Sequence, residues 1–252
     1  STANGMVGLA GDATSMLTIN DLTAASLSGT SLAIGGTGGA ALFSADGGDG
    51  ADALAHLSLT GKGNVTALAT GVGGNGSGGA GADGSSRTGG KGGRAGVTSN
   101  GVSTRGGTVI VTASNSGGHG GSGPTGGHGS DATLVDAVTG STAGPLRLVQ
   151  NATGGLGGSA FTGPSGTPGD AISTLTFNQA GASSLTIETR AVAGGGAGGF
   201  LNAPGAQALA SIDATSNAPT FDLMAIATGG QGGGITAFGS NHDAADGGVR
   251  DS

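Results

Sequence analysis

The sequence predicts an all-β protein built as a stacked repeat, similar to a solenoid, with no helices. Three observations lead to this prediction. Glycine makes up 61 of the 252 residues and in places returns at every third position. Short segments that alternate apolar and polar residues lie between the glycine-rich stretches, and a period of two is typical of strands. Both features recur together about every 35–44 residues, which indicates about six copies of one unit.

The glycine-rich stretches have a period of three. The clearest register consists of Gly117, Gly120, Gly123, Gly126 and Gly129. This period matches neither the α-helix nor the strand, but it matches an extended left-handed helix with three residues per turn. Such helices have no internal hydrogen bonds, so their backbone groups must find partners on neighbouring segments or water. Flexible loops between strands are the alternative interpretation.

Two anchors in the sequence define the copies. A glycine doublet opens each one, and a small residue, Asp and Ala usually follow the glycine stretch, as in Gly169-Asp170-Ala171. We therefore expect one repeat domain over residues 1–252. Its approximate copies are 1–34 (partial), 35–72, 73–116, 117–153, 154–193, 194–228 and 229–252 (partial).

Within a copy, the glycine stretch is followed by two strands with a turn between them. In the copy 154–193 the strands are expected at 172–177 and 185–189, on either side of a turn at 178–181. The same pair is expected at 134–138 and 146–149 and again at 208–212 and 221–226. We interpret each pair as a β-hairpin. One hairpin cannot bury its apolar face, so the copies must stack.

Composition limits the class of protein. Hydrophobic residues are 35% and aromatic residues 2% of the chain, so we expect a thin core. The net charge of −7 argues against nucleic acid as a partner. The absence of cysteine fits a bacterial extracellular protein. The sequence has neither a signal peptide nor an apolar run that could cross a membrane, and it begins in mid-pattern, so we expect a processed product or an excerpt.

One stretch matches a calcium-binding nonapeptide. Residues 47–55 fit the pattern G-G-x-G-x-D-x-U-x, and the chain in this respect resembles repeats-in-toxin proteins. The resemblance implies that Asp49 and Asp52 bind calcium, although the match is solitary here. Alternatively, aspartates mark the change from glycine stretch to strand and satisfy local backbone N–H groups. These aspartates are Asp12, Asp52, Asp131, Asp170 and Asp243.

The histidines do not predict a metal site. His119 and His128 would be about 28 Å apart along one face of a straight threefold helix, and His56 and His242 have no close partner in the sequence. We expect surface histidines. Cysteine is absent, acidic residues are few, and no glycine stretch ends as a phosphate loop does. We therefore predict no enzyme and assign no catalytic, cofactor-binding or metal-binding residues.

Five of the eight basic residues lie in the copy 73–116 and at its edges. The cluster is either a solvated loop or a contact surface for an acidic partner. These residues are Lys62, Arg87, Lys91, Arg94 and Arg105.

The Gly-Gly-x-Gly-Gly stretches at 35–39, 117–121 and 154–158 resemble polyglycine-II proteins. These include mycobacterial glycine-rich surface repeats, a phage tail-tip adhesin and springtail antifreeze proteins. The paired strands look more like the β-repeats of large bacterial surface proteins. The resemblance implies an extracellular protein that binds or scaffolds.

The sequence leads to one main functional expectation and two alternatives. Residues 1–11 and 236–243 fall at nearly the same phase of the repeat, and no cap is evident, which favours head-to-tail association. We therefore expect a structural subunit of an extracellular filament, stalk or surface layer. One alternative is an adhesin or passenger module that displays glycine-rich loops. The other is an ice-binding face, formed by Thr174 and Thr176 or by Thr186 and Thr189.

Overall fold

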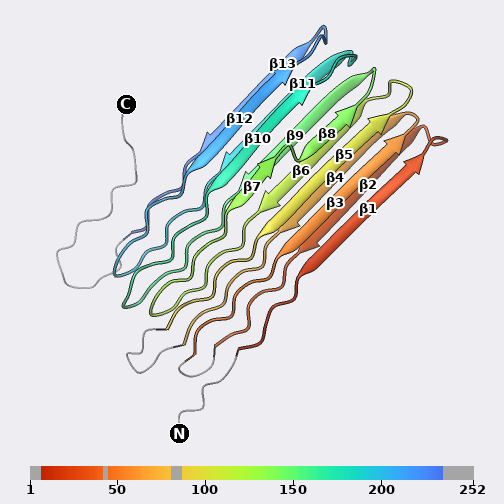
Figure 1. The fold of residues 1–252 in the computed structure, drawn as a ribbon. Coiled ribbons are helices and arrows are strands. Elements are labelled where there is room, and N and C mark those ends of the chain that lie inside the picture. The colour runs from red at the N-terminus through yellow and green to blue at the C-terminus, as the bar shows by residue number, and fades with distance from the viewer. Residues whose placement is uncertain (1–6, 42–44, 81–86, 235–252) are drawn as a thin grey trace, which may run out of the picture.

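The computed structural model describes residues 7–41, 45–80 and 87–234, and the regular elements in these ranges are strands, with no helix. Figure 1 shows the strands side by side in one half of the molecule and the glycine-rich stretches in the other half. The all-β prediction is therefore confirmed. The strands are β1 (Ala13–Asp21), β2 (Ser26–Ile34), β3 (Ala53–Gly61), β4 (Asn64–Val72), β5 (Ala95–Ser103), β6 (Val109–Ser116), β7 (Ala132–Val135), β8 (Val138–Ser141), β9 (Pro145–Thr153), β10 (Ala171–Asn178), β11 (Ser184–Val192), β12 (Ala208–Thr215) and β13 (Phe221–Thr228).

The strands form parallel sheets in which successive turns lie on one another. A 6-stranded sheet with the order β13-β11-β9-β6-β4-β2 faces two smaller sheets with the orders β1-β3-β5-β8 and β12-β10-β7. Pairing is in register, so equivalent residues of neighbouring turns lie side by side, as Leu148 and Ile187 do. The chain is a β-solenoid, as the stacked-repeat prediction requires (Figure 1).

The predicted hairpins are wrong in their pairing. β10 pairs with β7 and β12, and β11 pairs with β9 and β13, so the two strands of one copy do not pair with each other. They belong to opposite sheets and pack face to face across the core. Local alternation cannot distinguish these two arrangements, because both bury one face of each strand.

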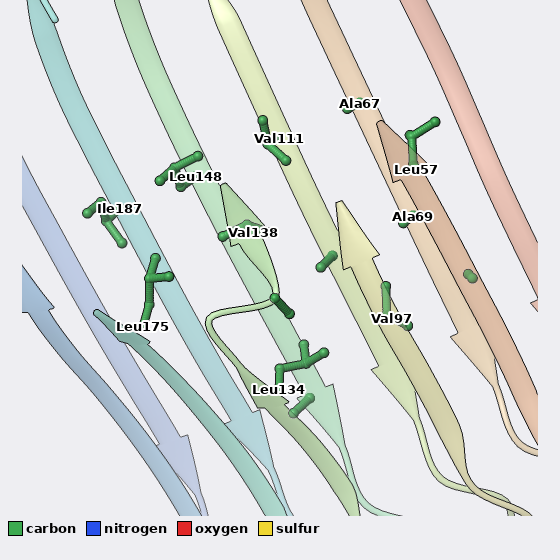
Figure 2. Packing of buried hydrophobic residues seen from close by; sticks show 14 of the residues in the cluster. Leu57, Ala67, Ala69, Val97, Val111, Leu134, Val138, Leu148, Leu175 and Ile187 are labelled. Atoms are coloured by element: carbon green, nitrogen blue, oxygen red, sulfur yellow. The ribbon is translucent and has the colours of Figure 1, made fainter. Parts of the chain in front are cut away.

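The alternating residues of both sheets meet in a thin apolar core. In β3 the buried and more exposed positions alternate from Ala53 to Gly61, and Figure 2 shows the buried side chains gathered along the stacked strands. Full burial of a leucine or isoleucine stabilises the fold by about 1.5–3 kcal/mol. The largest fully buried apolar side chains are Leu57, Leu59, Val65, Val109, Val111, Leu134, Val138, Leu148, Leu175, Leu185 and Ile187.

Backbone hydrogen bonds take the place of side-chain packing in the glycine half. The amide of Gly73 donates to the carbonyl oxygen of Ser116 in the next turn (2.9 Å), and the amide of Gly74 donates to Ala51 in the facing layer (2.8 Å). The same two directions return three residues later. A Cβ atom on Gly50 would overlap the carbonyl oxygen of Gly74 in the facing layer, so the layers come this close only because the residue is glycine.

Each glycine stretch runs out from the strands and back again, forming two arms (Figure 1). The amide of Gly127 donates to the carbonyl oxygen of Gly121 (2.8 Å), so the arms of this stretch lie against each other. His119 and His128 are therefore on opposite arms. The predicted spacing of about 28 Å along one face is wrong, because it assumed one straight threefold helix.

The fourth turn of the solenoid, which contains β7, β8 and β9, departs from the repeat. The strand expected over 134–138 is interrupted at Asp136, whose φ of 49° is left-handed, and its two parts, β7 and β8, pair with different strands. Gln150 is fully buried behind the break. Its Oε1 accepts the amide hydrogens of Ala137 (2.6 Å) and Val138 (3.2 Å). A buried glutamine thus replaces the ladder bonds that the break removes.

Candidate functional site

A row of aspartates accepts backbone hydrogen bonds along the outer surface of the glycine half. Asp12 Oδ1 accepts the amide hydrogen of Asp52 (3.0 Å), and Asp52 Oδ1 accepts that of Arg94 (2.7 Å). Asp131 and Asp170 repeat this contact. The four aspartates directly precede strands, as predicted. Their partners, however, are not local, because each amide belongs to the next turn, 37–42 residues later.

Asp49 and Asp52, the residues implied as calcium ligands, both belong to such rows. Asp49 Oδ1 accepts the amide hydrogen of Lys91 (2.7 Å). Within the described residues, no three side chains of His, Asp or Glu come together in a group that could hold a metal ion. Asp243 and His242 lie outside the described residues.

Two histidines act as the same kind of acceptor. Nδ1 of His119 accepts the amide hydrogen of Leu156 (2.8 Å), and Nδ1 of His128 accepts that of Thr167 (3.1 Å). Both histidines are exposed, in agreement with the prediction of surface histidines. Nδ1 of each ring thus takes the place that an aspartate oxygen has elsewhere in the glycine half.

The basic residues do not form one contact surface. Lys62 and Arg105 lie in the loops after β3 and β5, where the amide of Arg105 donates to the carbonyl oxygen of Lys62 (3.1 Å). Lys91 and Arg94 precede β5 in the glycine half. Nine strand residues therefore separate the two pairs, which corresponds to roughly 30 Å.

The threonines considered for an ice-binding face are divided between surface and core. Thr174 and Thr176 alternate with the buried Ser173 and Leu175 of β10. Thr189 is fully buried in β11. The pair Thr186 and Thr189 therefore does not lie on one face.

Both ends of the solenoid are open in the part of the chain that the structure describes. β1 and β2 at one end, and β12 and β13 at the other, have a paired strand on only one side. Phe221 and Leu223 of β13 are 41% and 42% exposed, whereas Leu185 and Ile187, their register partners in β11, are fully buried. The last turn therefore presents core-type side chains at an unpaired sheet edge.

The two open ends also differ in their backbone groups. Within one layer, hydrogen bonds between glycine arms run from the amide of one turn to the carbonyl of the next, as from Gly196 to Gln231 (2.8 Å). Among the described residues, the amide of Gly232 at one end has no acceptor and the carbonyl of Thr37 at the other has no donor. Across the layers the direction is reversed, as from Gly74 to Ala51. Within one layer, the amides left without an acceptor at one end therefore match the carbonyls left without a donor at the other end.

Sequence reasoning missed a polar notch on the strand half. The break between β7 and β8 leaves a hollow of about 240 Å³, and its polar lining includes His56, Thr98, Asn100, Asp136 and Thr139. The signal in the sequence is an aspartate inside an otherwise apolar strand pattern at 134–138. Such an interruption predicts a bulge or break.

Comparisons with known proteins identify no relative: no family model, no curated protein and no solved structure matches the chain. In the described ranges, the structure contains no helix that is long and apolar enough to cross a membrane.

Proposed function

We propose that this chain is a non-enzymatic structural subunit that associates head to tail with identical copies into a filament, stalk or surface layer. The observation that carries the proposal is the complementarity of the two open ends. Head-to-tail contact between unlike surfaces produces open fibres when it does not close into a ring.

Continuing the solenoid across a subunit boundary satisfies the backbone groups of the glycine half. The amide of Gly232 would lie where it can donate to Thr37 of the next copy, as Gly196 donates to Gln231 within the chain. The amide of Gly205 would face Leu9 in the same way, as Gly50 faces Lys91 (2.8 Å). Water hydrates these groups in the free subunit, so each hydrogen bond formed across the boundary contributes about 0.5–1.5 kcal/mol net to association.

The strand half matches at the same boundary. Phe221 and Leu27 lie at opposite ends of one inward-facing column that continues through Leu185, Leu146, Val109 and Val65. A further turn of the solenoid would place β13 beside β2, so that Phe221 contacts Leu27. Burial of this apolar surface is the main favourable term in such an interface.

We also infer that the glycine arms adopt polyglycine-II helices. Along an arm, the amide hydrogens of three successive positions point in three directions. The first donates to the next turn, the second donates to the facing layer, and the third, on the outward residue, donates to the previous turn. The amides of Gly73, Gly74 and His119 are examples of the three. A period of three in these directions supports a helix with three residues per turn.

We place the assembly outside the cell, on a bacterial surface. The lack of cysteine and the net charge of −7 support this location, because the fold then depends on no thiol chemistry and the surface repels nucleic acid. Reading the flanking gene sequence tests the location. A signal sequence upstream supports it, and a gene context of cytoplasmic proteins contradicts it.

Matched variants at the open end test self-association. Leu223 and Met224 are neighbours in β13 with 42% and 46% exposure, but only Leu223 lies in the inward column of Ile187. Negative-stain microscopy and sedimentation should find filaments for the wild type and for Met224→Asp, and monomers for Leu223→Asp. Monodisperse wild-type monomers at high concentration would refute the proposal, and so would filaments unaffected by Leu223→Asp.

An adhesin is the second candidate, and exposed apolar side chains favour it. Phe161 and Leu201 are 68% and 57% exposed. Each lies between two paired arms of a glycine stretch, since Gly166 donates to Gly158 and Ala206 donates to Gly194. A binding module would use these two side chains to contact its ligand. Replacing both residues with serine should abolish binding to host cells or surfaces while leaving filament formation intact. Equal binding of the double variant would contradict an adhesin that uses these side chains.

A further inference from the structure

The break in the fourth turn is the least repetitive feature of this molecule. Elsewhere the strands run for eight or nine residues, but β7 and β8 have four residues each. The break puts Asp136 in the left-handed region and requires a fully buried polar residue, Gln150. Features that cost stability and are held in place by surrounding contacts are often found at functional sites.

The neighbouring turns hold polar side chains in fixed positions around the break. Nδ1 of His56 lies 2.7 Å from Oγ1 of Thr98. Asn100 donates to Oγ of Ser58 (3.2 Å) and accepts from Oγ1 of Thr139 (2.9 Å). These bonds fix the orientation of the imidazole and the amide before any ligand arrives. A preorganised site loses less conformational entropy on binding.

Hydrogen-bonding capacity remains in the notch. Asp136 Oδ1 accepts the amide hydrogen of Thr176 (2.6 Å), which leaves its second oxygen for another donor. Within the described residues, Nε2 of His56 likewise has no hydrogen-bond partner, since the ring bonds through Nδ1.

The lining defines the class of ligand. It contains no lysine or arginine, which disfavours phosphate and carboxylate ligands. It is also not part of any metal-binding group among the described residues. The lining offers both hydrogen-bond donors and acceptors. This combination suits hydroxyl groups, because a hydroxyl group donates and accepts at once. The volume of about 240 Å³ is below the range of about 300–1,000 Å³ for sites of drug-sized molecules.

We propose that this notch binds a single neutral sugar residue, either free or at the end of a glycan. His56, Asn100 and Asp136 would contact its hydroxyl groups. The site lies on the outer surface of the β1-β3-β5-β8 sheet, away from both open ends, so the proposal does not depend on head-to-tail association. A filament would display one such site per subunit.

Saturation-transfer difference NMR with the full chain tests the proposal. The probes are glucose, galactose, mannose and N-acetylglucosamine, each as the free sugar and as the end residue of an oligosaccharide. We expect saturation transfer to at least one of these sugars. A stronger signal for the oligosaccharide would identify a glycan end as the ligand, and equal signals would identify the free sugar. No transfer to any probe overturns the proposal.

Variants locate the binding. Asp136→Asn and His56→Ala should each weaken binding roughly tenfold, because each removes a hydrogen bond that involves a charged or fixed polar group. Asp136→Gly should weaken it similarly and keeps the fold, since glycine adopts positive φ freely. Asp213→Asn, on β12 and outside the notch lining, is the matched control and should bind like the wild type. Undiminished binding by folded Asp136→Asn and Asp136→Gly would also overturn the proposal.

Discussion

The strand half and the glycine half of each turn hold the same stack together by different means. In the strand half, side chains such as Leu57 and Ile187 fill the space between two sheets. In the glycine half, the facing layers are joined by direct backbone hydrogen bonds, as between Gly74 and Ala51. A solenoid with few large side chains can therefore remain ordered where backbone groups supply the contacts between layers.

The largest effect is expected in the strand half. Leu57→Ala removes a fully buried side chain from β3, and the free energy of unfolding should fall by about 2–5 kcal/mol. Leu54, in the same strand, is 46% exposed, and Leu54→Ala should change that free energy by no more than about 0.5 kcal/mol. Urea unfolding measures both. Equal losses would show that the core does not distinguish the two faces of β3.

In the glycine half, adding one methyl group should have a comparable but smaller effect. A Cβ atom on Gly76 would overlap the carbonyl oxygen of Gly90, whereas one on Gly78 would lie 3.3 Å from that of Ser122. Overpacking usually costs about 1–3 kcal/mol, so Gly76→Ala should lose about this much stability. Gly78→Ala, from the same arm, should remain close to the wild type in urea unfolding. A tolerated Gly76→Ala would contradict direct backbone packing.

The aspartate rows add a contact of another kind to the glycine half. Here a side-chain oxygen accepts the hydrogen of a backbone amide in the next turn. Asp52→Ala removes the acceptor of the Arg94 amide hydrogen (2.7 Å) and should reduce the free energy of unfolding by about 1 kcal/mol. Asp52→Asn retains an acceptor oxygen and should lose less. Hydrogen exchange at the Arg94 amide should speed up in the alanine variant only. Unchanged exchange in both would contradict the role of this row.

The smallest effect on stability is expected at Asp21, the last residue of β1. The pKa of the Asp21 carboxyl lies below its usual 3.8, chiefly because the side chain of Thr23 donates to it, with the amides of Thr23 and Ala24 adding to the effect. A depressed folded-state pKa stabilises the fold above the unfolded-state pKa, and this contribution is lost as pH falls through the folded-state value.

An NMR titration of the Asp21 carboxyl checks this assignment. The midpoint should lie below 3.8 in the wild type and should rise in Thr23→Ala. Because solvent screens this carboxyl at the end of β1, global stability should change little between pH 5 and pH 3 on its account. A midpoint that does not respond to Thr23→Ala would refute the hydrogen bond as the cause.

Local patterns in the sequence predict much of the strand half. The strands expected at 172–177 and 185–189 lie within β10 and β11, since alternation reports which face of a strand is buried. The residues of one strand do not identify the strands that it pairs with, because every strand has the same alternation of period two. The hairpin interpretation failed for this reason.

Long-range contacts limit what can be predicted of the candidate sites. Asp52 could be recognised as an acceptor, but its donor lies 42 residues away in the next turn. The notch is formed by three neighbouring turns, which bring His56, Asn100 and Asp136 together. No sequence pattern within one copy contains all three. The open ends likewise become apparent only when the direction of the hydrogen bonds is known.

Cryo-electron microscopy of the assembled full chain tests head-to-tail association most directly. We expect unbranched filaments one solenoid wide, in which the strand spacing of about 4.8 Å continues without interruption across subunit boundaries. Six strands per subunit in the larger sheet correspond to a subunit repeat of roughly 29 Å along the filament. Isolated monomers at high concentration, or paired subunits joined by identical ends, would contradict head-to-tail association.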